Sequence, residues 1–231
     1  MNRIKIDDRL KAVASLVREG SIVADIGTDH AYLLCYLINS GKIPSGIGAD
    51  LRKGPLENAR KTVIEYGLSD KVELILSDGL EKLPENCAHD VVIAGMGGIL
   101  ISEILEKATW IYNSKVNIVA QPMTHAEHLR EFFIRNKFKI SEETTATDGK
   151  RFYCIIRASY TGVEQIKDRS YYYLGELLKN DDSTTKSYIN KMLYSLEKKL
   201  AALKSAGVSD DENLFELISE IKYKIKEAYN D

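Results

Sequence analysis

Acidic side chains follow three successive apolar runs in the first third of the chain. In chain order they are Asp25 and Asp29, then Asp50, then Asp78. If the three runs are parallel strands of one sheet, their ends meet at its carboxyl edge, where α/β proteins bind ligands. Carboxylates at that edge accept hydrogen bonds from hydroxyl and amino groups. The set therefore predicts a site for a nucleoside-like ligand, and it is far more specific than any one of its members.

The first of these acids lie in the stretch Ile22 to Tyr32, which reads IVADIGTDHAY. An apolar run that ends at Gly27 and continues into a helix-forming segment is typical of a strand, a tight turn and a helix around a ligand. The dinucleotide pattern G-x-G-x-x-G is absent, because Asp29 stands two residues after Gly27. An acid there repels a pyrophosphate but tolerates an ammonium and a sulfonium, so S-adenosylmethionine is favoured over NAD. The alternative is an ordinary buried strand and turn.

Asp50 and Asp78 extend the same predicted site. Asp50 ends the run GIGAD, where a carboxylate can accept hydrogen bonds from both hydroxyls of a ribose. Asp78 can accept a hydrogen bond from an adenine amino group, while Gly79 beside it keeps the backbone close to the ring. On its own Asp50 is equally well a solvated loop acid, but its spacing from the first motif favours the binding role.

Two later runs bring further residues to the same edge. The run 90–94 leads into the sequence GMGG at 95–98, and the run 116–120 leads into QPM at 121–123. Three glycines in four residues indicate close approach by something flat or bulky, with a flexible connector as the alternative. Gln121 adds an amide side chain.

The alternation of strands and helices predicts five βα units closed by a hairpin. The predicted strands cover 22–26, 47–49, 72–76, 90–94 and 116–120, and the predicted helices cover 7–19, 31–38, 55–67 and segments after 98 and 123. The closing hairpin joins 144–147 to 152–156 through Asp148-Gly149, a pair preferred in type I′ turns. This architecture is typical of the Rossmann-like methyltransferases, and half of a dehydrogenase does not end in this way.

The tail from about Gly162 has the pattern of helices alone. The segment 168–178 contains three consecutive tyrosines, and 187–203 carries an apolar stripe at helical spacing. Ser209-x-x-Glu212 is a capping box for a last helix, whose apolar residues run from Leu214 to Ile225. Two long amphipathic helices joined by a short loop predict an antiparallel hairpin. Acids slightly outnumber bases in this tail, so it is not a basic arm as a whole. Packing or dimerisation and RNA contact stay open as its roles.

The composition of the chain restricts its possible partners and cellular compartment. The formal net charge of the 231 residues is −2, so contact with RNA must come from local basic patches. The three cysteines are far apart and show no C-x-x-C spacing, which favours a reducing cytosol. No apolar run has the length of a signal or membrane span, and the histidines lack carboxylate or cysteine neighbours at metal spacing. We therefore expect a cytoplasmic protein with no membrane segment and no metal.

Five motifs together resemble the bacterial tRNA adenine-N1-methyltransferases of the TrmK type. They are DIGTDHAY (25–32), GADL (48–51), SDGL (77–80), GMGG (95–98) and QP (121–122). The resemblance implies an α/β fold with a Rossmann-like S-adenosylmethionine-dependent methyltransferase domain at residues 1–160. It also implies a C-terminal α-helical, coiled-coil-like hairpin at 161–231, and methylation of adenine 22 in the D arm of tRNA. We expect a monomer or weak dimer.

We expect particular roles for residues of these motifs. Contacts to S-adenosylmethionine are expected from Asp25, Gly27, His30, Asp50, Leu51, Asp78, Gly79 and Gly95, and contacts to the tRNA base from Tyr32, Met96, Gly97 and Gln121. Asp29 is the candidate catalytic residue, which orients the base and steadies the positive charge that develops on adenine. Equally, Asp29 could serve only to hold the amino-acid end of the cofactor.

The chemistry sets its own requirements. Adenine N1 carries a lone pair in the neutral base, so catalysis needs alignment with the methyl donor rather than a general base. A paired base hides this edge, so it must be extruded. Phosphate contacts are expected from Arg3, Lys5, Arg9, Lys11, Arg52, Lys53, Lys150 and Arg151. The competing classes are a nucleotide-dependent oxidoreductase, a non-catalytic RNA-binding scaffold, and a methyltransferase with a protein or small-molecule acceptor.

Overall fold

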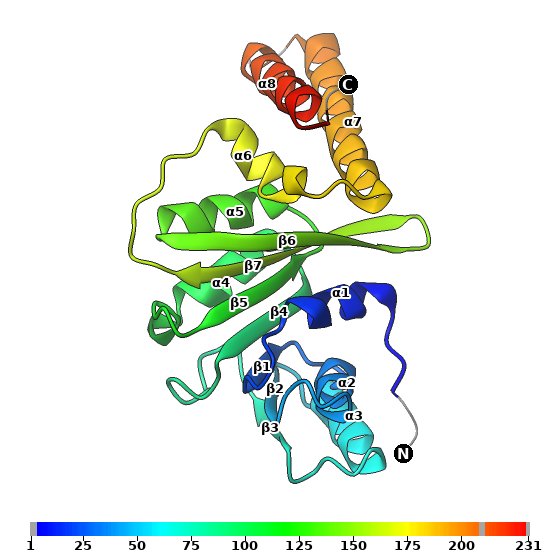
Figure 1. The fold of residues 1–231 in the computed structure, drawn as a ribbon, viewed down its shortest axis with the longest axis vertical. Helices are drawn as coiled ribbons and strands as arrows, with labels where there is room; N and C mark the ends of the chain where they lie inside the picture. Colours follow the sequence, from blue (N-terminus) through cyan, green and yellow to red (C-terminus); the bar gives the residue numbers. More distant parts are fainter. Residues whose placement is uncertain (1–3, 208–210, 230–231) are drawn as a thin grey trace.

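A seven-stranded sheet forms the centre of the molecule (Figure 1) in the computed structural model, which describes residues 4–207 and 211–229. The strands are β1 (Val23–Ile26), β2 (Gly46–Asp50), β3 (Val72–Leu76), β4 (Asp90–Met96), β5 (Asn117–Pro122), β6 (Phe138–Asp148) and β7 (Arg151–Tyr160). Their order in the sheet is β3-β2-β1-β4-β5-β7-β6. The first five are parallel and the last two antiparallel to their neighbours, so the predicted parallel strands and closing hairpin are confirmed. Of the five predicted βα units the third is incomplete, because residues 77–89, all of them described, form turns and no helix.

Helices cover both faces of the sheet. They are α1 (Asp8–Leu16), α2 (Tyr32–Asn39), α3 (Lys53–Glu65), α4 (Gly98–Glu106) and α5 (Ala126–Arg135), with a short 3₁₀ turn η1 (Thr109–Ile111) after α4. One apolar core packs α4 and α5 against one face, and a second packs α1, α2 and α3 against the other. Side chains of successive strand residues enter opposite cores, as Val91 and Val92 do, because a strand turns alternate side chains to opposite faces.

The hairpin of β6 and β7 differs by one residue from the predicted turn. Asp148 pairs with Arg151, so the two-residue loop is Gly149-Lys150 rather than Asp148-Gly149. Gly149 takes φ +57°, as the first residue of a primed hairpin turn requires. The strands are also longer than predicted, and the tip of the hairpin extends past the end of β5 on the carboxyl edge of the sheet.

The C-terminal helices have an apolar core of their own. They are α6 (Arg169–Leu174), the 3₁₀ turn η2 (Leu177–Lys179), α7 (Ser183–Ala206) and α8 (Asp211–Tyr229). Leucines and isoleucines of α7 and α8 pack together in this core, and Figure 1 shows the two helices side by side. Helix α7 begins before the predicted residue 187, because the Asp182 carboxylate accepts hydrogen bonds from the backbone of Thr184 and Thr185. Ser209 of the predicted capping box lies outside the described residues.

A buried ion pair joins this C-terminal part to the sheet. Arg130 Nε of α5 donates to Glu143 Oε1 of β6 at 2.8 Å, and both side chains are fully buried. Arg130 Nη1 also donates to the backbone oxygens of Tyr172 and Tyr173, and Glu143 Oε2 accepts from the backbone of Glu176 at 2.6 Å. The pair therefore fixes the start of the helical tail over α5.

Candidate active site

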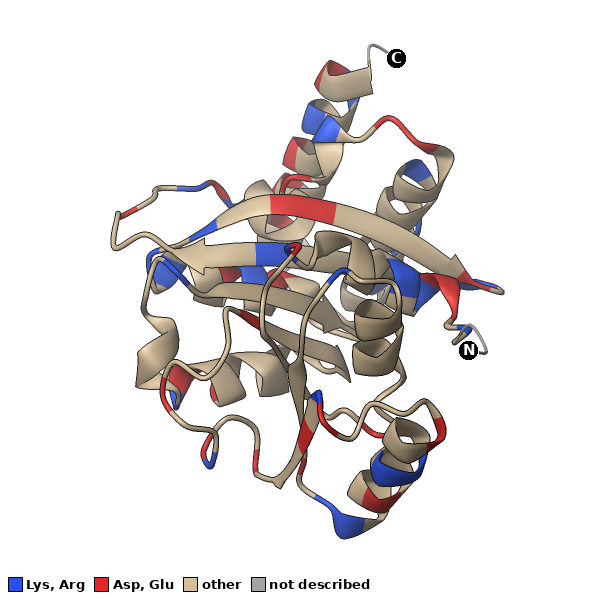
Figure 2. Ribbon diagram, turned by 60° about the horizontal axis from the view of Figure 1, so that its bottom comes forward, with Lys and Arg blue, Asp and Glu red and all other residues tan. Residues whose placement is uncertain are grey.

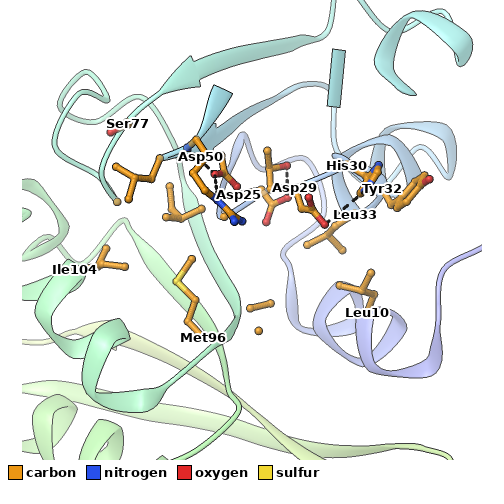
Figure 3. Close-up of a pocket in the computed structure, with 18 of the residues that line it drawn as sticks. Leu10, Asp25, Asp29, His30, Tyr32, Leu33, Asp50, Ser77, Met96 and Ile104 are labelled. Atoms are coloured by element: carbon orange, nitrogen blue, oxygen red, sulfur yellow. Dashed lines mark hydrogen bonds and ion pairs between the residues drawn. The ribbon is translucent and has the colours of Figure 1, made fainter. Parts of the chain in front are cut away.

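A cavity of about 660 Å³ opens at the carboxyl ends of β1 to β4 (Figure 3), within the range of small-molecule sites. Most of the predicted site residues line it: Asp25, Gly27, Asp29, His30, Tyr32, Asp50, Leu51, Asp78, Gly79, Gly95 and Met96. Arg9 and Leu10 of helix α1 and its N-cap residue Asp7 also line the cavity. Gly97 and Gln121 do not line it.

The loop between β1 and α2 has an unusual backbone. Gly27, Asp29 and Ala31 take φ values of +73°, +48° and +56°. The left-handed conformation costs a non-glycine residue roughly 1–3 kcal/mol, and such strain is concentrated at functional sites. Backbone N–H groups of Gly27 and Thr28 both donate to the Ala49 carbonyl, at 2.8 and 3.0 Å, which ties the loop to the end of β2. The loop directs the Asp29 side chain, which is 63% exposed, into the cavity.

Asp25 lies at the closed end of the cavity. Thr28 Oγ1 donates to its Oδ2 at 2.7 Å, and the carboxyl is buried. Burial raises the pKa of Asp25 to about 6, although the bond from Thr28 and the positive charge of Arg9 act to lower it. A cation placed beside this carboxyl would favour its ionised form.

Asp50 keeps most of its hydrogen-bonding capacity for a ligand. Its Oδ1 accepts from the backbone N–H of Arg52 at 2.9 Å, and the side chain is almost buried at the end of β2. A carboxylate has about four lone-pair sites, so one such bond leaves room for two hydroxyl donors. Figure 3 shows Asp50 close to Asp25, above Met96.

Gly79 meets two separate requirements. Its φ is +54°, and a Cβ at this position would lie 2.7 Å from Ile104 Cγ2 of α4. The residue therefore lets the chain after Asp78 turn while Ile104 closes that side of the cavity.

The GMGG loop does not act as one unit. Gly95 and Met96 line the cavity, whereas Gly97 caps α4 and its Cβ would lie 3.2 Å from Thr124 Oγ1. Gly98 is pressed against the backbone of His125, where a Cβ would clash. The glycines of this loop therefore serve two purposes. Gly95 lies at the cavity, whereas Gly97 and Gly98 allow the start of α4 to pack against the loop that precedes α5.

Gln121 is fully buried, and its link to the cavity is Arg9. Arg9 Nη1 donates to Gln121 Oε1 at 2.8 Å, while Gln121 Nε2 donates to the Pro122 carbonyl at 3.1 Å. Arg9 itself lines the cavity. The sequence predicts a phosphate contact for Arg9 and does not indicate this placement. The one signal for it is a basic residue beside the apolar face of the first helix.

An aromatic stack stands at one side of the cavity. The rings of His30 and Tyr32 lie parallel within 8°, with centroids 5.2 Å apart, and both side chains are partly exposed. His30 Nε2 lies 3.9 Å from Asp29 Oδ2. This arrangement offers a flat surface beside a carboxylate, which suits a planar base.

Basic residues are spread among acidic ones, as Figure 2 shows. Of the predicted phosphate contacts, Arg52 lines the cavity, Lys11 pairs with Asp8 at 2.7 Å, and Lys150 and Arg151 lie at the hairpin tip. Arg3 lies outside the described residues. Within residues 4–207 and 211–229, no helix is long and apolar enough to span a membrane, and no cluster of three or more His, Cys, Asp or Glu side chains could bind a metal.

The sequence is similar to those of known methyltransferases. The fold and the cavity define a Rossmann-like methyltransferase, and a family model described as "Methyltransferase domain" matches residues 6–156. The tRNA (adenine(22)-N(1))-methyltransferase of Bacillus subtilis is 34% identical over 170 residues, which cover 71% of each chain. This chain belongs to the family of tRNA (adenine(22)-N(1))-methyltransferases.

Solved structures agree in fold over nearly the whole chain. A Streptococcus pneumoniae protein, assigned provisionally as a tRNA (m1A22) methyltransferase, superposes with a TM-score of 0.86 at 30% identity and covers 96% of this chain and 100% of its own. The TrmK of M. capricolum, in complex with S-adenosylhomocysteine, gives a TM-score of 0.79 at 27% identity over 96% of this chain and 98% of its own.

Proposed function

We propose that this protein transfers the methyl group of S-adenosylmethionine to N1 of adenine 22 in the D arm of tRNA. The observation that carries the proposal is the cavity at the carboxyl edge, where acids from three strand ends converge in a chain of this family. The tRNA substrate and the position of the adenine are taken from the names of related proteins. The cavity supports a nucleoside cofactor, and the stacked rings of His30 and Tyr32 beside it support a planar base as acceptor.

The residues present fit the cofactor. Asp78 and Gly79 after β3 suit the adenine, and Asp50 at the end of β2 suits both ribose hydroxyls. The methionyl part then reaches Gly27 and Asp25, where the buried carboxyl suits an ammonium. We assign His30, Leu51 and Gly95 to the walls of the same site.

The acceptor base enters between the β1–α2 loop and Met96. Bound S-adenosylmethionine supplies an electrophilic methyl group, and adenine N1 supplies its own lone pair, so the residues of the chain act chiefly by alignment. We propose that adenine 22 is extruded from the D arm, stacks on Tyr32 and is oriented by Asp29, whose exposed carboxylate also offsets the positive charge formed on the methylated ring. Gly97 and Gln121 do not line this pocket, so we propose that they support residues that do: Gly97 follows Met96 at the start of α4, and Gln121 holds Arg9.

tRNA contacts beyond the base come from local basic residues. Lys150 and Arg151 at the hairpin tip lie toward the edge that bears the cavity and suit phosphates. Lys5 before α1 and Lys11 within it are further candidates. We propose that the protein works in the cytoplasm as a monomer or weak dimer. We also propose that residues 1–160 form the catalytic domain and 161–231 a separate helical domain.

Nucleoside analysis of the product tests the proposed reaction. An unmodified tRNA transcript is incubated with the enzyme and S-adenosylmethionine, digested, and separated by mass-detected chromatography. The proposal predicts 1-methyladenosine as the product. N6-methyladenosine, or methylation of another base, would contradict the assignment of N1.

A further inference from the structure

Large apolar side chains are exposed mainly at the carboxyl edge of the sheet. Among residues 4–160 seven such side chains are exposed, and six of them lie at the end of a parallel strand or in the segment that follows it. The six are Tyr32, Leu51, Leu76, Ile99, Leu100 and Met123, and the seventh, Ile64, lies on α3. Single exposed apolar residues are normal on a protein surface, whereas their concentration at one edge indicates a binding surface.

Two of the six stand just beyond the cavity, on the side of β4 and β5. Three of the six line the cavity and can be covered by a ligand inside it. Ile99 and Met123 do not line it, and they are 42% and 44% exposed. The remaining residue, Leu76, ends β3 at the far side of the sheet. Ile99 and Met123, here called the rim pair, therefore stay in contact with water when a small molecule fills the cavity.

Backbone hydrogen bonds hold the rim pair beside the place proposed for the acceptor base. The N–H of Met123 donates to the carbonyl of Met96 at 2.8 Å. The N–H of Gly98 donates to the carbonyl of Thr124 at 2.7 Å, and Ile99 follows Gly98 in the first turn of α4. Met96 lines the cavity (Figure 3), so the rim pair flanks the entrance that the base would use.

The side chain of Met123 is restrained although it is exposed. Gln121 is fully buried, and its Nε2 donates to Met123 Sδ at 3.5 Å and to the Pro122 carbonyl at 3.1 Å. A thioether sulfur is a weak acceptor, so this contact favours one placement of the side chain without burying it. A side chain that is already restrained loses less conformational entropy when it binds a partner.

The sequence around the rim pair is poor in the cations that bind phosphate. From Asp90 to Glu127 it contains two lysines and no arginine. Lys107 pairs with Glu81 at 3.2 Å, and Lys115 precedes β5, at the opposite edge of the sheet. Phosphates are bound largely by basic and hydrogen-bonding side chains, whereas apolar side chains contact the faces of bases. The rim pair therefore suits unstacked bases rather than the RNA backbone.

We infer that the rim pair is a wedge that enters the base stack of the D arm and fills the space that adenine 22 leaves when it is extruded. The inference rests on the proposed function. Isoleucine and methionine are among the side chains that separate stacked bases in nucleic-acid complexes. Extrusion costs the free energy of unstacking and unpairing. A side chain that occupies the vacated place favours the extruded state, so Ile99 and Met123 are positioning residues that do not touch the cofactor.

The unstacking of the base can be measured with 2-aminopurine in place of adenine 22, because its fluorescence rises when it leaves a stack. With S-adenosylhomocysteine present, wild-type protein should raise the signal severalfold. The double variant Ile99→Ala, Met123→Ala should lose about half of this rise or more, while its Kd for S-adenosylhomocysteine in calorimetry stays within about twofold of wild type. Ile64→Ala is the matched control, since it removes an exposed apolar side chain on α3, and it should behave as wild type.

A substrate in which adenine 22 is unpaired separates extrusion from later steps. A transcript with an abasic site opposite adenine 22 releases the base at lower cost. On the intact transcript, with both substrates saturating, kcat of the double variant should fall about tenfold, whereas on the abasic transcript it should stay within about twofold of wild type. Met123→Leu keeps an apolar side chain of similar volume and should retain most of the rate on both transcripts.

A double variant that unstacks 2-aminopurine as wild type does would overturn the inference and leave the rim pair to contact with a protein. Equal losses of rate on the two transcripts would also overturn it, because the defect would then follow extrusion. The same holds if wild-type protein methylates the intact transcript without raising the fluorescence. Failure of wild-type protein to methylate any tRNA transcript would instead contradict the proposed function itself.

Discussion

Met96 of β4 lies directly over Gly27 at the end of β1, so that a Cβ at position 27 would clash with the Met96 methyl carbon. The two residues come from different motifs and from neighbouring parallel strands. Because Gly27 also needs φ +73°, the cavity floor depends on a glycine for its conformation and for its space.

Gly27→Ala should therefore weaken cofactor binding more than it weakens folding. The substituted residue is strained by roughly 1–3 kcal/mol and pushes Met96 into the cavity. We expect the Kd for S-adenosylhomocysteine to rise by about tenfold or more in calorimetry. Gly54→Ala is the matched control, since a Cβ there meets nothing within 4 Å in helix α3, and its binding should equal that of wild type. Equal affinity of the Gly27 variant would show that this contact does not shape the site.

Asp25 should make the stability of the ligand-free protein depend on pH. Its pKa rises from 3.8 to about 6 on folding because the carboxyl is buried, so the folded state favours the proton. Its contribution is fully present below about pH 4 and is lost as the pH rises through 6, a change on the order of 3 kcal/mol. Asp25→Asn should then be more stable than wild type at pH 8 but not at pH 4, as measured by urea unfolding. A pH-independent difference would contradict the ionisation of a buried Asp25.

Asp29 should affect the rate more than cofactor affinity. Asn tolerates the left-handed backbone at φ +48°, so Asp29→Asn removes the charge with little strain. We expect kcat to fall by about a hundredfold, or about 2.7 kcal/mol, while the Kd for S-adenosylhomocysteine changes by less than about threefold. Asp29→Ala should lose as much rate and some stability as well. Equal losses of rate and affinity would assign Asp29 to the amino-acid end of the cofactor.

The buried pair of Arg130 and Glu143 should matter for stability. Arg130→Ala leaves a buried carboxylate without its partner and should cost about 3–5 kcal/mol in the free energy of unfolding. The exposed pair of Arg135 and Glu131 offers a matched control on the same helix, and Arg135→Ala should cost less than about 1 kcal/mol. Similar losses for the two variants in urea unfolding would contradict a special role for the buried pair.

The parts of the fold that follow local patterns were predictable from the sequence. Continuous apolar runs marked the parallel strands, and the acids after them marked one edge, so Asp25, Asp50 and Asp78 were correctly expected to meet. The hairpin was predicted too, but its turn was misplaced by one residue because Asp148 belongs to the strand pairing and Gly149 begins the turn.

Long-range side-chain pairs were not predictable. Arg9 and Gln121 are joined only after α1 packs near the end of β5, and nothing near either residue indicates the other. The same holds for Arg130 of α5 and Glu143 of β6, because charged side chains are usually exposed and both of these are buried. The sequence places Gly98 in a predicted ligand loop. A glycine is needed there because the backbone of His125, which precedes α5, leaves no room for a Cβ.

Two tRNA transcripts that differ at one base test whether adenine 22 is the methylated position. Labelled methyl transfer from S-adenosylmethionine is measured on an unmodified transcript and on one with guanine in place of adenine 22. We expect label on the adenine transcript alone. Equal labelling of both would contradict the assigned position, and no label on either, with S-adenosylhomocysteine binding intact, would contradict tRNA as the substrate.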